Sequence, residues 1–407
     1  MTMKLRLAAV GGDVEAQYNL GLQYIGTAED PQTSVHWFLK AAEQGHALAQ
    51  FNLGLLYAGS QGLAQDLERA IFWYRKAAEQ GYARAQFNLG LIYNSASAKY
   101  QNIMQALAWY IKASEQGHSG AQNNIGLLYI TGQGIPRDHR KAITWFEKAA
   151  VSGDAAAQNN LGMIYGSGKD MPPDYPRAIS WYGKAAEQGY AGAYYNLGLL
   201  FANGLGVARD HRQAVDWYRK AALLGHVKTQ YNLALLFESG EDSVRNSAEA
   251  AHWYGKAAEQ NHVGACYRLG LCFDLGLGVP ENGQRALEWF RKAATGGHSD
   301  AQFRLALRYD SGQDGQQDCA QALFWYRKAG EHKVVRAQFN LGLMYACGHG
   351  TPVDLLQAHA WLSVAAQNGM EKASSHQYKI ESRMDPAELL EARRVLQELL
   401  EQHKLLG

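Results

Sequence analysis

The sequence that decides the fold is residues 49–78, AQFNLGLLYAGSQGLAQDLERAIFWYRKAA, in which two helical patterns flank a turn. In each pattern, apolar residues recur at spacings of three and four, which places them on one face of a helix. In the first pattern these residues are Ala49, Leu53, Leu56 and Tyr57. In the second they are Ala70, Trp73, Tyr74, Ala77 and Ala78. The stretch therefore predicts two helices that pack together as a hairpin.

This pair of helices repeats along the whole chain. The ten tryptophans lie 36 residues apart, at Trp37, Trp73, Trp109, Trp145, Trp181, Trp217, Trp253, Trp289, Trp325 and Trp361. A fixed period of about 20–50 residues is the signature of a solenoid built from one stacked unit. The position of Gly54 is Gly in eight units and Ala in two, at Ala234 and Ala306. Because Gly inside a helix costs about 1 kcal/mol against Ala, its recurrence indicates a close approach between helices.

The connections between the helices carry signals of their own. A glycine follows the second helix in eight units, where the left-handed conformation that ends a helix suits it. These are Gly45, Gly81, Gly117, Gly153, Gly189, Gly225, Gly297 and Gly369. Asn261 also tolerates that conformation, whereas Lys333 does not, so we expect the turn before the last unit to differ. Asp138, Asp210 and Asp354 stand where N-caps of second helices belong.

Aligned on these signals, the chain divides into ten units and a C-terminal segment. The units cover residues 14–46, 47–82, 83–118, 119–154, 155–190, 191–226, 227–262, 263–298, 299–334 and 335–370. Residues 5–12 have the pattern of one more second helix. Capping helices are expected over residues 371–407, with Asp385 as an N-cap, Pro386 at the first helical position and Glu388 two residues later. A terminal helix that covers the last open face is what a solenoid requires.

The pattern A-x-x-x-L-G-x-x-Y, then a G-x-G turn, then A-x-x-W-x-x-K-A-A-x-x-G resembles the Sel1-like repeat, a relative of the tetratricopeptide repeat. The turns at residues 132–138 and 204–210 match the family closely, and the resemblance covers about residues 5–370. It implies an all-α fold, a right-handed superhelical α-solenoid of antiparallel helix pairs. It also implies a scaffold or adaptor role, often in bacterial envelope, signalling or host-interaction pathways. A fold alone does not identify the partner.

Composition excludes several classes of function. The 407 residues include 39 basic and 38 acidic ones, for a net charge of +1, with no long block of like charge. A basic patch for nucleic acid or a membrane surface is therefore not expected. No stretch reaches the roughly 18 apolar residues of a membrane span. Without a recognisable secretory segment, we expect a cytoplasmic monomer, although a signal peptide already removed would leave the same sequence in the periplasm or outside the cell.

Most histidines and lysines, residue types that often carry chemistry, recur here at the period of the repeat, whereas the cysteines do not. Five histidines occupy the same turn in different units, too far apart to share a metal, at His46, His118, His226, His262 and His298. The four cysteines, Cys266, Cys272, Cys319 and Cys347, lack CxxC spacing and are expected to be free, buried thiols. A lysine follows the tryptophan by three residues in nine units, where it complements the helix dipole and its stem can cover the ring. We expect no catalytic residue, metal or cofactor.

The face of the first helix opposite the core offers the best candidate for partner binding. One column along it is mostly aromatic, with Phe51, Phe87, Tyr195, Tyr231, Tyr267, Phe303 and Phe339, and with Asn123 and Asn159 in two units. The next column holds Asn52, Asn88, Asn124, Asn160, Asn196, Asn232 and Asn340. Regularly spaced amides can bind the backbone of an extended peptide, and aromatic rings can anchor its side chains. The amides could instead bond the adjacent helix.

Two units depart from the asparagine column. Arg268 and Arg304 replace Asn, and Arg308 replaces an apolar residue one turn after Arg304. Three guanidinium groups in units eight and nine would suit an acidic side chain or a C-terminal carboxylate of a partner. Asp274 or Asp310 could instead neutralise them within the chain.

The sequence thus predicts a non-enzymatic scaffold or adaptor that binds another protein or an extended peptide along a concave groove. A lipid- or glycan-binding envelope scaffold stays open as an alternative. A penicillin-binding or β-lactamase-type enzyme is disfavoured, because the relatives associated with penicillin binding carry paired cysteines in each repeat and this chain does not.

Overall fold

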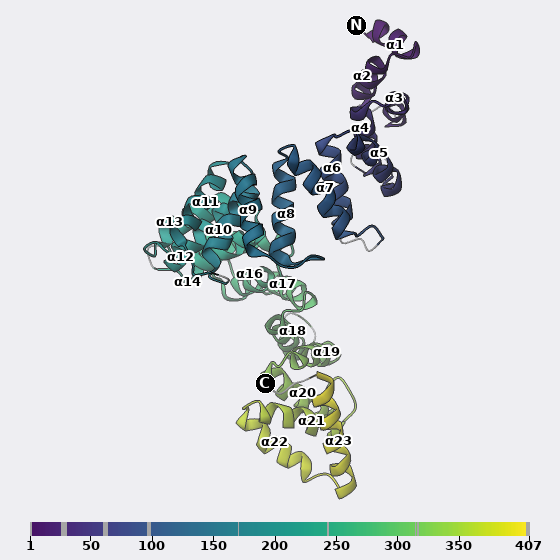
Figure 1. Cartoon of the computed structure of the whole chain (residues 1–407). Helices are drawn as coiled ribbons and strands as arrows, with labels where there is room; N and C mark the ends of the chain where they lie inside the picture. The colour runs from purple at the N-terminus through teal and green to yellow at the C-terminus, as the bar shows by residue number, and fades with distance from the viewer. Residues whose placement is uncertain are drawn as a thin grey trace. The chain divides into compact units, whose positions relative to one another are not determined.

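A computed structural model describes residues 2–25, 31–59, 64–95, 99–169, 171–241, 244–313, 315 and 317–403, and over these residues all regular structure is α-helix (Figure 1). The first helices of the units are α2 (Val14–Tyr24), α4 (Ala47–Tyr57), α6 (Ala83–Tyr93), α8 (Ser119–Thr131), α10 (Ala155–Ser167), α12 (Ala191–Asn203), α14 (Val227–Ser239), α16 (Val263–Leu275), α18 (Ser299–Ser311) and α20 (Val335–Cys347). The second helices are α3 (Pro31–Glu43), α5 (Leu67–Glu79), α7 (Ile103–Glu115), α9 (His139–Val151), α11 (Tyr175–Glu187), α13 (His211–Leu223), α15 (Ser247–Glu259), α17 (Gly283–Thr295), α19 (Cys319–Glu331) and α21 (Leu355–Gln367).

The chain forms two compact bodies, Met1–Leu197 and Gly198–Gly407, with the division inside α12. Within each body, the first helix of a unit packs on its own second helix, and that second helix packs on the first helix of the next unit. Each unit thus contacts mainly its neighbours, as in a solenoid. The predicted all-α solenoid of helix pairs is confirmed.

The recurring glycine of the first helix lies under an aromatic ring of the second. A Cβ added to Gly54 would lie 2.4 Å from the ring of Tyr74, and one added to Gly90 would lie 2.4 Å from the ring of Tyr110. Both rings are buried, so the helices approach closely because the glycine has no side chain.

A ladder of glutamines joins successive units. Gln50 Nε2 donates to the carbonyl of Ala42 at the end of the preceding second helix (3.0 Å), and Gln80 Nε2 donates to Gln50 Oε1 (2.8 Å). The same side-chain pair recurs at Gln44–Gln17, Gln116–Gln86, Gln188–Gln158, Gln260–Gln230 and Asn368–Gln338. Ser152 and His332 stand at the donor position in two other units. There the buried acceptors, Gln122 Oε1 and Gln302 Oε1, have no hydrogen-bond partner.

The helix ends follow the sequence signals with one exception. Asp138, Asp210 and Asp354 cap second helices, and each accepts a backbone N–H three residues on, as predicted. The expectation of a different turn at Lys333 is wrong: Lys333 adopts φ 63° and Asn261 adopts φ 62°, both in the left-handed region. Lys333 N–H and Val334 N–H bond the carbonyls of Gly330 and Ala329, as in the glycine turns, so the backbone bonds of the repeat outweigh the local strain.

Additional helices cover both ends of the array. Helix α1 (Thr2–Val10) takes the place of a second helix before α2, and Gln17 bonds its Ala9 carbonyl. At the other end, α21 contacts α22 (Glu371–Glu381) and α23 (Pro386–His403). Asp385 and Glu388 cap α23 reciprocally, as predicted. Within the described ranges, no helix is both long and apolar enough to cross a bilayer.

Candidate partner-binding surface

The face of the first helices opposite the core is the candidate surface, which we call the first-helix surface. It comprises the aromatic column, the asparagine column and a third column that lies one turn after the aromatic one. The third column holds Leu22, Leu55, Leu91, Leu127, Met163, Leu199, Leu235, Leu271, Leu307 and Leu343. All ten are at least partly exposed, and Leu91 and Met163 are 43% and 51% exposed.

The leucine column is not among the predicted binding residues, although Leu55 lies four residues after Phe51 and so shares its helix face. Because Leu55 lies two residues from Leu53, helical geometry turns it away from the core. A large apolar residue kept on the solvent side of ten units is a recurring feature of interaction surfaces.

The aromatic column is partly built into the units. Phe87, Tyr195, Tyr231, Tyr267, Phe303 and Phe339 are half-buried, and Phe51 is buried. Several of these rings have two aromatic neighbours. One is a ring on the second helix of the same unit, and the other is the residue that caps the first helix of the following unit. For Phe87 these neighbours are Tyr110 (centroids 5.9 Å apart) and His118 (4.4 Å, stacked). The rings therefore offer an edge to a partner, with one face already covered.

The turn histidines explain that stacking, because they are N-caps of the first helices. His118 Nδ1 accepts the N–H of Ala121, and His262 Nδ1 accepts that of Ala265. Burial lowers the pKa of His118, His226, His262 and His298. The neutral imidazole that can accept at Nδ1 is thus favoured. The prediction that these residues belong to the repeat is confirmed.

The asparagine column makes contacts within the chain. Asn160 Nδ2 donates to Asn123 Oδ1, and Asn196 Nδ2 donates to Asn159 Oδ1, both at 2.9 Å. Elsewhere Asn52, Asn88, Asn124 and Asn340 lie beside Tyr18, Tyr74, Tyr110 and Tyr326, and each partly opposes the rise in pKa that burial causes in its tyrosine. Burial raises the pKa of Tyr74 to about 12. Asn232 also has an interaction. Because an amide has two N–H donors and an acceptor, these contacts leave capacity for a ligand.

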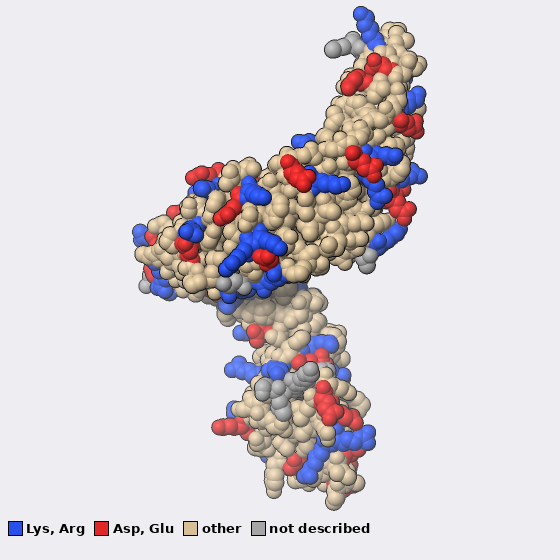
Figure 2. All heavy atoms as spheres, in the orientation of Figure 1, with Lys and Arg blue, Asp and Glu red and all other residues tan. Residues whose placement is uncertain are grey.

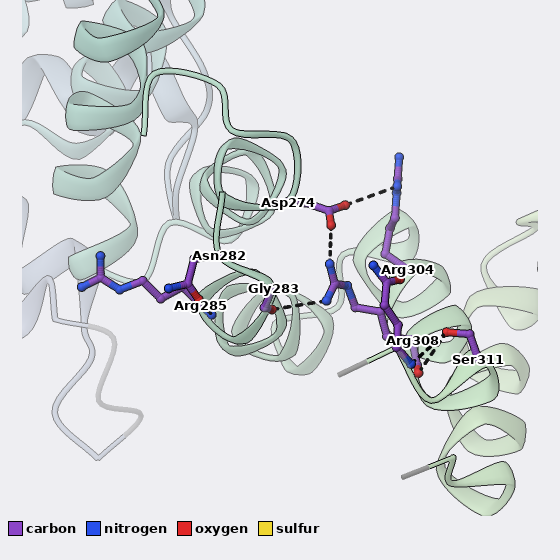
Figure 3. Close-up of polar contacts among 8 residues, drawn as sticks. Asp274, Asn282, Gly283, Arg285, Arg304, Arg308 and Ser311 are labelled. Atoms are coloured by element: carbon purple, nitrogen blue, oxygen red, sulfur yellow. Dashed lines mark hydrogen bonds and ion pairs between the residues drawn. The ribbon is translucent and has the colours of Figure 1, made fainter. Parts of the chain in front are cut away.

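The three arginines are paired with acids of the preceding unit. Arg304 (3.6 Å) and Arg308 both contact Asp274, toward which they point in Figure 3. Arg268 lies 3.3 Å from Glu238 instead. The side chain of Arg308 is 5% exposed, and it also donates to the carbonyl of Gly283, so its guanidinium is enclosed between units. Arg268 and Arg304 are 39% and 42% exposed, and partner binding through them stays a prediction. The sequence signal for this pairing is an acid 30 residues before Arg268 and before Arg304, which for Arg308 lies 34 residues before.

Other charged and polar groups also take places in the repeat. Lysine ammonium groups lie over tryptophan rings in several units, as at Lys184 and Trp181 (4.1 Å). On the face in Figure 2, acidic and basic residues are interspersed.

Among the described residues, no group of three or more His, Cys, Asp or Glu could hold a metal ion. All four cysteines are free, but only Cys266 and Cys272 are buried; Cys347 is exposed because it ends α20 beside a turn.

The repeat pattern has matches among known proteins. The Sel1 repeat matches residues 14–46, 47–82, 83–118, 119–154, 155–190, 191–226, 227–262, 263–298, 299–333 and 335–370. A protective antigen with an SLR fold from uropathogenic Escherichia coli is 35% identical over 98% of this chain and 86% of that one, with a TM-score of 0.63. A Sel1 repeat protein from Oxalobacter formigenes is 33% identical over 76% of this chain and 90% of that one, with a TM-score of 0.58. No curated protein matches the chain.

The fold and these matches define a class of α-helical repeat proteins. The chain belongs to the Sel1 repeat family. Proteins of this family generally mediate protein–protein interactions and are generally not catalysts.

Proposed function

We propose that the chain is a non-enzymatic adaptor that binds an extended segment of a partner protein along its first-helix surface. The leucine column carries this proposal, because it is apolar in all ten units and stays at least partly exposed in each, even where Leu55, Leu307 and Leu343 also pack against the core. Burial of such side chains against a partner contributes about 1.5–3 kcal/mol each when it is complete. The adjacent asparagines would bond the backbone of the segment, and the aromatic edges would contact its side chains.

A selection from a random peptide library, followed by fluorescence polarisation, tests this proposal. The variant Leu91→Ser/Leu127→Ser/Met163→Ser removes three exposed apolar groups from the first-helix surface. We expect this variant to bind the selected peptides more than about tenfold more weakly than the wild-type protein does.

A matched control removes exposed apolar groups elsewhere. Val151, Leu223 and Leu224 are 83%, 73% and 60% exposed at ends of second helices. Their replacement by Ser should leave affinity unchanged. Failure to select any peptide, or equal affinity for the wild-type protein and the leucine-column variant, would refute the proposal.

A further inference from the structure

A recess between the second helices α15 and α17 lies away from the first-helix surface. Its volume is about 480 Å³, within the range of ligand pockets of about 300–1,000 Å³. Leu269 and Phe273 of α16 line it together with Trp289 of α17. Gly255 of α15 opens it, since a Cβ added there would meet no atom within 4 Å.

Four other units carry an arginine at the position of Gly255, namely Arg75, Arg219, Arg291 and Arg327, and in three of them it bonds a tyrosine of the next unit; the remaining units carry Leu39, Ile111, Glu147, Gly183 and Ser363. Arg75 donates to the hydroxyl of Tyr93 (2.9 Å), 18 residues later, and Arg291 donates to that of Tyr309 (2.9 Å). Arg327 and Tyr345 form the same pair. At the recess, Gly255 replaces the arginine and Phe273 replaces the tyrosine. Unlike those three units, this one has neither the guanidinium nor its hydroxyl acceptor.

A carboxylate accompanies this loss. Glu288 lines the recess, 33 residues after Gly255. The corresponding positions elsewhere are His36, Phe72, Ala108, Thr144, Ser180, His252, Phe324 and Ala360, with one other acid, Asp216. Asp216 follows Gly183 by the same 33 residues, with Phe201 at the same 18-residue interval. In the sequence, an acid at this position therefore occurs only where the arginine is replaced by glycine.

The charged side chains around the recess can accommodate one more cation. Lys256 is already paired with Glu259 (3.6 Å), and the Arg285 guanidinium lies 5.1 Å from the centre of the Phe273 ring. His252 packs its edge on Trp253. Lys292, whose ammonium lies 4.5 Å from the centre of the Trp289 ring, is a third cation beside Lys256 and Arg285. Among the described residues, Glu288 has no ion pair and is the carboxylate that an incoming cation would meet. A guanidinium can stack on the aromatic rings while it bonds a carboxylate.

We propose that this recess binds an arginine side chain of a partner protein, which takes the place that Arg75, Arg291 and Arg327 occupy in their own units. Phe273 and Trp289 would contact its stem and guanidinium plane, and Glu288 would accept its N–H groups. The site is independent of the first-helix surface, so either proposal can fail alone.

The test uses the full chain and N-acetyl-arginine amide, with the indole N–H resonance of Trp289 as the readout, assigned with Trp289→Phe. We expect a saturating shift with the arginine amide and none with N-acetyl-citrulline amide, its uncharged analogue. Glu288→Gln should weaken binding by up to about fivefold, as loss of one partly exposed charge pair implies. Gly255→Arg should abolish the shift while the protein stays folded, because its side chain would fill the recess.

A control variant separates shape from charge. Arg291→Gly vacates the corresponding place one unit later, where position 324 is Phe, so the Trp325 resonance should not respond to the arginine amide. The absence of a saturating shift at Trp289, an equal response to citrulline, or binding that survives Gly255→Arg would each overturn the proposal. Markedly tighter binding of free L-arginine than of the blocked amide would assign the recess to a small molecule and would also overturn it.

Discussion

The side-chain amide of Gln80, at the end of the second helix of its unit, donates a hydrogen bond to Gln50 Oε1 on the first helix of the same unit. Gln50 in turn bonds the backbone of the unit before it, so the two residues connect three successive helices. Because Gln50 is 4% exposed, water cannot readily replace Gln80 as its partner.

Ser152→Gln should complete this ladder at one of the units where it is broken. The new amide would reach Gln122 Oε1, which is buried without a partner, and should raise the free energy of unfolding by about 1 kcal/mol. Urea denaturation would measure the change. The converse variant Gln80→Ser strands Gln50 Oε1 and should lower stability by about 1–3 kcal/mol. A neutral effect of both substitutions would show that the ladder does not stabilise the array.

Lys333→Gly should stabilise the protein. Lys333 holds φ 63°, a conformation that costs an L-residue about 1 kcal/mol and costs glycine little. The midpoint of thermal unfolding should therefore rise. Gly81→Lys is the matched control, because Gly81 has φ 86° in the same turn and should become strained. If Lys333→Gly lowers the midpoint, contacts of the lysine side chain outweigh the backbone strain.

Arg308 and Arg304 contact the same carboxylate but should differ in their effect on stability. Removing one partner of a buried ion pair costs about 3–5 kcal/mol, and Arg308 is enclosed. Arg304 is 42% exposed, and an exposed pair contributes about 0–1 kcal/mol. Arg308→Ala should thus lower the urea midpoint far more than Arg304→Ala does. Similar losses would mean that Asp274 is solvated well enough to tolerate either change.

Acid should destabilise the array through its histidine caps. Burial lowers the folded-state pKa of His118, His226, His262 and His298, so the unfolded chain takes up protons first. Near His118, Arg84 lowers the pKa further and Asp154 raises it. The contribution of these residues is fully present above the unfolded pKa of about 6.5 and is lost as pH falls through the folded values.

Replacement of these four histidines by Asn, a cap that does not titrate, should flatten the dependence of the thermal midpoint on pH below about pH 7. Asp154 shows that another residue can serve, since it caps α10 through the same bond to the residue three positions on. Calorimetry across the pH range would compare the two proteins. An equal loss of stability in both would place the acid sensitivity elsewhere.

The 36-residue period predicts most of the fold, because spacing, caps and glycines are local properties of the sequence. The turn at Lys333 was not predicted, because hydrogen bonds to Gly330 and Ala329 outweigh the conformational preference of one residue. The ion pairs of Arg268 and Arg304 depend on contacts across 30 residues, a separation that becomes adjacency only when units stack. Helical geometry places Leu55 on the face of Phe51, but the leucine column was not singled out, because a sequence does not show how much of each side chain stays exposed once the units stack.

The glutamine ladder also bears on how the array can evolve. A duplication or deletion of one 36-residue segment of the gene preserves the spacing between Gln50, Gln80 and their equivalents, so most junctions would survive a change in unit number. The junction at Asp274 is different. Loss of residues 299–334 would remove Arg304 and Arg308 and set Asp274 against Asn340 and Met344, with no cation in either position. Recombination between units is therefore tolerated along much of the gene but selected against where neighbouring units carry opposite charges.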